Sequence, residues 1–117
     1  MARLIVSASA SARPGYLNAG IYISVSDATS GEPVSGLGFQ NFEIWLFAPA
    51  LKFDISKIDE GRPGFYRMVI QLPNFQWTNV GFYSIEVIVN KQRRPEWDKG
   101  QVVADLSVLP SEQWVPR

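Results

Sequence analysis

The amino-acid sequence predicts an all-β domain, folded as a sandwich or a barrel. Apolar residues alternate with polar ones over short runs, and clusters of Gly, Pro, Asn and Asp separate these runs. No long stretch has the apolar period of 3.6 residues that is typical of an amphipathic helix. The chain has 117 residues, 46% of them hydrophobic and 19% charged, which suits one domain with a single core. We expect this domain over residues 1–109 and a C-terminal tail over residues 110–117.

Seven runs carry the strand pattern. They cover residues 4–9, 21–26, 42–48, 51–56, 65–72, 82–90 and 101–109. Because successive side chains of a strand point to opposite faces, each run has one parity that faces the core. The run 42–48 is apolar on both parities, so its core face is either that of Ile44 and Leu46 or that of Trp45 and Phe47. Residues 59–64 have the composition of a turn.

Two segments resemble immunoglobulin-like domains. Residues 79–85, Asn-Val-Gly-Phe-Tyr-Ser-Ile, resemble the pattern Asp-x-Gly-x-Tyr-x-Cys at the entry to the sixth strand of that superfamily. Residues 27–44, with Pro33-Val34 and Gly36-Leu37, are similar to the corresponding part of bacterial immunoglobulin-like domains. The resemblance implies a seven-stranded antiparallel immunoglobulin-like β-sandwich.

The same resemblance implies four structural residues. Gly81 and Tyr83 occupy the conserved glycine and tyrosine positions of the pattern, and the tyrosine hydroxyl would bond to backbone a few residues upstream. Ile85 stands where the family has a disulfide cysteine, and Ile23 would be its apolar core partner on the second strand.

The composition argues against several classes of function. There is no cysteine or histidine, which excludes disulfides, thiol catalysis and zinc sites of the cysteine or histidine type. Lys plus Arg and Asp plus Glu both number 11, so the basic excess typical of nucleic-acid binding is missing. No apolar run has the length of a secretion signal or a membrane helix. We therefore expect no catalysis, cofactor, nucleic-acid binding or membrane insertion, with a cytoplasmic or virion-associated location for an intact chain and an extracellular one for an excised domain.

The most distinctive polar segment is the loop 91–99, which we expect between the last two strands. It contains Arg93, Arg94 and Trp97, and arginine with tryptophan is a common composition of interface anchors. These three residues are our candidate contacts for a partner protein. The alternative is a solvated hairpin loop with Trp97 folded over the sheet edge.

A second candidate site lies between residues 72 and 82. Aromatic rings flanked by amides often bind carbohydrate, and this stretch contains them: Asn74, Phe75, Gln76 and Trp77. The alternative is that Trp77 closes the open end of the core beside Tyr83.

Acidic residues and strand edges suggest two further possibilities. Asp27, Glu32, Asp59 and Glu60 fall in loops of one end, but they lack the close Asp-x-Asp spacing of a calcium site, so we expect no metal. The first or last strand could pair with a second copy through an open edge. The sequence thus predicts a protein-interaction or structural module of a bacterial or phage assembly or surface protein, with carbohydrate binding as the alternative.

Overall fold

The chain folds into β-strands throughout the part that the structure describes. The computed structural model describes residues 3–13, 16–47, 50–72, 77, 81–90 and 99–108. The regular elements of these residues are β1 (Leu4–Ala12), β2 (Asn18–Asp27), the 3-10 helix η1 (Phe39–Asn41), β3 (Phe42–Leu46), β4 (Leu51–Lys52), β5 (Asp54–Glu60), β6 (Phe65–Gln71), β7 (Gly81–Asn90) and β8 (Lys99–Val108). The all-β prediction is confirmed.

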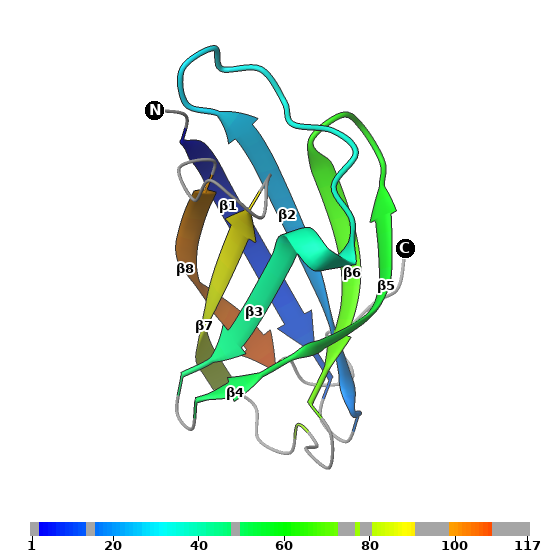
Figure 1. Ribbon diagram of the computed structural model, residues 1–117. Coiled ribbons are helices and arrows are strands. Elements are labelled where there is room, and N and C mark those ends of the chain that lie inside the picture. The colour runs from blue at the N-terminus through cyan, green and yellow to red at the C-terminus, as the bar shows by residue number, and fades with distance from the viewer. Residues whose placement is uncertain are drawn as a thin grey trace.

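The eight strands form one mixed sheet, in the order β4-β3-β7-β8-β1-β2-β6-β5. Figure 1 shows this sheet curled on itself, with β3 and β7 in front of β1 and β2. Seven antiparallel strands were expected, and this expectation is wrong in number and in direction. The last three residues of β1 pair in parallel with residues 106–108 of β8, and all other ladders are antiparallel.

The expected strand 51–56 is two strands on opposite edges of the sheet. Residues 51 and 52 pair with β3, whereas β5 pairs with β6 and extends into the expected turn, as far as Glu60. Phe53 lies between them, is 2% exposed, and donates its N–H to the Ile44 carbonyl at 2.8 Å. The chain therefore crosses from one edge of the sheet to the other at a buried phenylalanine, although the alternation of side chains runs through the crossing.

The core lies inside the curl and is filled by one parity of each long strand. On β2, β6 and β7 one parity is buried, as alternation predicts, and it comprises Ile21, Ile23 and Val25, then Tyr66, Met68 and Ile70, then Ile85, Val87 and Val89, with Tyr83 half-buried. On β3 the core face belongs to Phe42, Ile44 and Leu46, which are at most 4% exposed. Trp45 lies half-buried on the opposite face, where its indole N–H donates to Glu43 at 2.9 Å. Of the two tryptophans that the structure describes, Trp77 is the one in the core.

The strands at the two edges of the sheet are β4 and β5. The expectation of an open edge on the first or last strand is therefore wrong, because β1 lies between β8 and β2, and β8 between β7 and β1. β4 has only two residues. β5 carries Asp54, Lys57, Asp59 and Glu60 and is irregular between residues 55 and 57. Short, charged and irregular edges are features that oppose pairing with another chain.

Candidate functional site

Two loops, residues 28–38 and residues 61–64, meet at one end of the sheet (Figure 1). Tyr66, on β6 just after the second loop, is tied to the first, because its hydroxyl donates to the Val34 carbonyl at 2.6 Å and accepts the Leu37 N–H at 3.3 Å. The Tyr66 ring is 1% exposed and packs edge-on against Phe42, with 5.2 Å between ring centres. Burial raises the pKa of this phenol, so it stays a neutral donor.

Glu60 makes a second tie between the same loops. One carboxylate oxygen accepts the Gly64 N–H at 2.9 Å and the other accepts the Gly36 N–H at 3.1 Å. These backbone hydrogen bonds, from Gly64 first and Gly36 second, lower the pKa of the carboxyl from its ordinary value of 4.5. These hydrogen bonds hold the two loops to each other at this end of the domain.

The predicted partner contacts and most of the predicted sugar contacts lie outside the described residues. These are Arg93, Arg94 and Trp97 in one loop and Asn74, Phe75 and Gln76 in the other. Both assignments remain predictions for these residues.

Trp77 lies at one end of the core, beside Tyr83. This is the arrangement expected as the alternative to sugar binding. It is 0% exposed, stacks on Phe53 with 6.2 Å between ring centres, and meets Tyr83 edge-on at 5.0 Å. In this arrangement its ring has no exposed face on which a sugar could stack.

The residues implied by the family resemblance fall on core strands. Ile85 on β7 is 0% exposed and Ile23 on β2 is 1% exposed, so both are apolar core residues. Gly81 begins β7, and Tyr83 follows it with its ring against Trp77. The backbone just upstream, residues 78–80, lies outside the described residues, so the tyrosine hydrogen bond remains a prediction.

The acidic residues of the loop end have separate surroundings. Asp27 accepts the N–H groups of Thr29 and Ser30 at 2.8 and 3.1 Å, as in a local turn. Asp59 lies 3.6 Å from the Arg67 guanidinium and 3.9 Å from the Lys57 ammonium. Within the described residues, no group of three or more acidic side chains gathers as a metal site, and no helix could cross a membrane.

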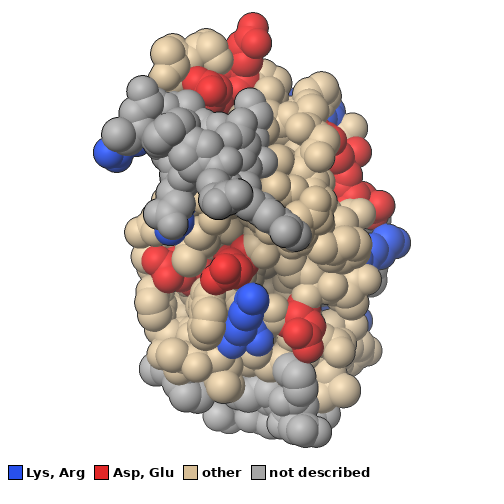
Figure 2. Space-filling model, in the orientation of Figure 1, with Lys and Arg blue, Asp and Glu red and all other residues tan. Residues whose placement is uncertain are grey.

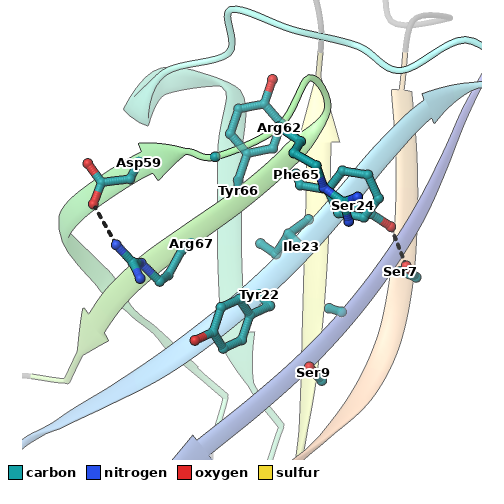
Figure 3. Close-up of a pocket in the computed structure, with 12 residues that line it drawn as sticks. Ser7, Ser9, Tyr22, Ile23, Ser24, Asp59, Arg62, Phe65, Tyr66 and Arg67 are labelled. Atoms are coloured by element: carbon teal, nitrogen blue, oxygen red, sulfur yellow. Dashed lines mark hydrogen bonds and ion pairs between the residues drawn. The ribbon is translucent and has the colours of Figure 1, made fainter. Parts of the chain in front are cut away.

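A shallow pocket that the sequence analysis missed lies on the outer face of β1, β2 and β6. Strand register creates two rows of side chains across these strands. One row is Ser9, Tyr22, Arg67 and Asp59, and the other is Ser7, Ser24 and Phe65. The small serines leave a hollow of about 570 Å³ between the larger tyrosine and phenylalanine side chains (Figure 3). We call this hollow the serine pocket.

Arginines line the rim of the serine pocket, and their surroundings differ. Arg62 lies over the ring of Phe65, with its guanidinium carbon 4.8 Å from the ring centre. Arg67 points to the other side, toward Asp59 (Figure 3). Ser7 and Ser24 are hydrogen-bonded to each other on the floor of the pocket. The arrangement can supply aromatic surface, hydroxyl groups and a cation to one ligand.

Sequence could have indicated this pocket through the outward parity of the strands. Tyr22 and Phe65 fall on that parity, where an exposed aromatic residue stands among serines. What sequence does not contain is the register that places Ser7 beside Ser24 and Ser24 beside Phe65.

Comparisons with protein-family models, with curated proteins and with solved structures found no match to this chain. The function must therefore be inferred from the surface of the protein. Among the described residues on the side seen in Figure 2, basic and acidic residues are interspersed and neither sign gathers in one large patch. That distribution agrees with the formal net charge of zero.

Proposed function

We propose that the protein is a non-catalytic protein-interaction module and that its contact surface is the outer face of β1, β2 and β6. The module would serve as one part of a larger assembly. The observation that carries this proposal is a group of large apolar side chains left exposed on a single face: Ile5 at 56%, Tyr22 at 61% and Phe65 at 49%. Apolar and aromatic residues with arginine nearby are typical of the centre of a protein interface.

We further propose that the curled sheet is an immunoglobulin-like arrangement. In support, the sheet divides into two groups of four strands, β4-β3-β7-β8 and β1-β2-β6-β5, which pack their apolar faces on a common core. Within the described residues, the two groups are joined by the short parallel ladder between β1 and β8 and by an isolated parallel bridge between Arg3 and Lys99. Such domains use one sheet face or one set of loops for binding, but fold alone does not fix function.

The chemistry of the serine pocket favours binding over catalysis. Its one carboxylate, Asp59, lies beside Arg67 and Lys57, so it is exposed and paired rather than buried. A serine nucleophile needs a base within hydrogen-bond reach, and Ser7 is instead bonded to the hydroxyl of Ser24.

The test is site-specific photo-cross-linking followed by reconstitution. A photoreactive phenylalanine analogue replaces Tyr22 in one variant and Val103 in a matched control, since Val103 is also 61% exposed but lies on β8. We expect the Tyr22 position to capture a defined protein from the natural host. The purified partner should then bind the unmodified module, and Tyr22→Ala should weaken that binding about tenfold or more.

A second copy of the chain is one such partner, and light scattering over a wide concentration range detects it. Self-association that Tyr22→Ala abolishes would support the proposed surface. Equal capture at positions 22 and 103, or a purified partner whose binding ignores Tyr22→Ala, would show that this face is not the interface.

A further inference from the structure

We infer that the serine pocket takes a carboxylate from an acidic segment of a partner protein, and that Arg62 binds it. This inference rests on the proposed function and adds the chemistry of the partner. The pocket has two guanidinium groups on its rim, and the structure gives them different surroundings.

Arg67 already has an anion, because Asp59 lies 3.6 Å from its guanidinium and both residues are exposed. Arg62 is exposed too, but none of the carboxylates of the described residues lies within ion-pair distance of it. The negative charge of Asp59 therefore offsets the positive charge of Arg67. The positive charge of Arg62, at the upper rim of the pocket, remains for a ligand.

Stacking prepares Arg62 for this role. The Phe65 ring lies beneath the guanidinium, with 4.8 Å between the ring centre and the guanidinium carbon. This contact already restricts the Arg62 side chain, so less rotamer freedom is lost when a ligand binds. A stacked guanidinium keeps the N–H groups of its plane free for a ligand, and two of them match the two oxygens of a carboxylate. The hydroxyls of Ser7 and Ser24 lie nearby on the floor, where one donates to the other, and the remaining hydroxyl proton can be donated to the same anion or to a neighbouring carbonyl.

The apolar surroundings favour a peptide over a sugar acid. Besides the two aromatic residues, the face exposes Ile5, which lies two positions before Ser7 on β1. An aliphatic side chain offers no ring for a sugar to stack on, whereas it packs well against the apolar side chains of a peptide. The expected occupant is thus a segment in which Asp or Glu stands among apolar residues.

The first experiment is a titration of the full chain, followed through its backbone amide NMR signals. The probe is a capped heptapeptide of alternating glutamate and leucine, and its control has glutamine in place of every glutamate. We expect the acidic peptide to shift the amides of Ser7, Ser24 and Phe65 and to bind more weakly as salt increases. The glutamine peptide should bind at least about threefold more weakly.

Variants test the role of Arg62 itself. Arg62→Gln should weaken the acidic peptide about three- to tenfold and leave the glutamine peptide unchanged. Arg13→Gln is the charge-matched control, because the Arg13 guanidinium carbon also lies over an aromatic ring, 4.7 Å from the centre of Tyr16, just after the C-terminal end of β1. It removes the same charge and should leave the affinity unchanged.

Each other outcome contradicts the inference. Equal affinity for both peptides, or equal losses in both variants, would show that no carboxylate is bound at Arg62. Amide shifts in the serine pocket with a galacturonate oligosaccharide but not with the acidic peptide would assign the pocket to sugar acids. If Tyr22→Ala abolishes partner binding while Arg62→Gln does not, the proposed interface stands and only the carboxylate assignment is wrong.

Discussion

Glu60 shows how a single side chain can set the shape of a loop end. Its two carboxylate oxygens accept N–H groups from Gly64, in its own turn, and from Gly36, in the loop between β2 and β3. Both donors are backbone groups that would otherwise need water or another acceptor. Sequence analysis placed Glu60 with Asp27, Glu32 and Asp59 in loops of one end and assigned it no partner, because a carboxylate in a loop gives no sign of which amides it will meet.

We expect the Glu60 interaction to make stability depend on pH. The folded pKa lies below the ordinary value of 4.5, so the stabilisation is complete above that value and disappears as pH falls through the lower folded pKa. At pH 7, Glu60→Gln should lower the free energy of unfolding by about 0.5–1 kcal/mol, a small loss because the site is exposed. Urea unfolding of the variant and wild type, from pH 7 down to pH 3, measures whether this difference vanishes in acid.

Glu32→Gln is the control for this experiment, because it makes the same change of charge in the loop that contains Gly36. A difference that persists unchanged at low pH, or that Glu32→Gln reproduces, would contradict the assigned role of Glu60.

At the scale of elements, the contact between β1 and β8 decides the topology. It joins strands from the two ends of the chain. Beyond the short parallel ladder, the backbones of the two strands also approach each other closely at Leu4 and Gly100. A Cβ atom added at Gly100 would lie 2.5 Å from the carbonyl oxygen of Leu4. Glycine at this position therefore lets β8 approach β1 more closely than any other residue would.

We predict that Gly100→Ala lowers the free energy of unfolding by about 1–3 kcal/mol, since backbone must shift to admit the methyl group. Gly20→Ala in β2 is the matched control, because nothing lies within 4 Å of its added Cβ. It should change stability by no more than about 0.5 kcal/mol. Chemical denaturation measures both, and equal effects would mean that β1 and β8 are not held this closely.

The division between β4 and β5 is the element that sequence reasoning did not resolve. Leu51, Phe53 and Ile55 keep one parity through the crossing, so alternation alone predicts one strand. The two pieces pair with β3 and β6, which are far apart in the sheet order. Partner choice depends on the whole sheet and leaves no local mark in the sequence.

For the whole molecule, Trp77 closes one end of the core. It packs between Phe53, at the crossing from β4 to β5, and Tyr83 on β7. Burial of a large aromatic side chain contributes strongly to stability, and its removal leaves a cavity that the surrounding side chains only partly fill.

Trp77→Ala should therefore lower the free energy of unfolding by about 3–5 kcal/mol. Trp45→Ala, which removes a half-buried ring from the opposite face of β3, should cost less than half of that loss. Guanidinium unfolding followed by circular dichroism compares the two. A Trp77 variant with wild-type stability would mean that this ring is not part of the core, and would restore it as a candidate surface for sugar.

The sequence by itself determined the all-β class, the positions of most strands and the parity that β2, β6 and β7 bury. It could do so because alternation and turn residues are local consequences of a half-buried pleated strand. Only the tertiary structure decided the parallel pairing of β1 with β8, the crossing at Phe53, the burial of Trp77 in place of Trp45, and the serine pocket. Each of these depends on which strands become neighbours and in what register, and residues that are distant in the chain settle that choice together when they share one core.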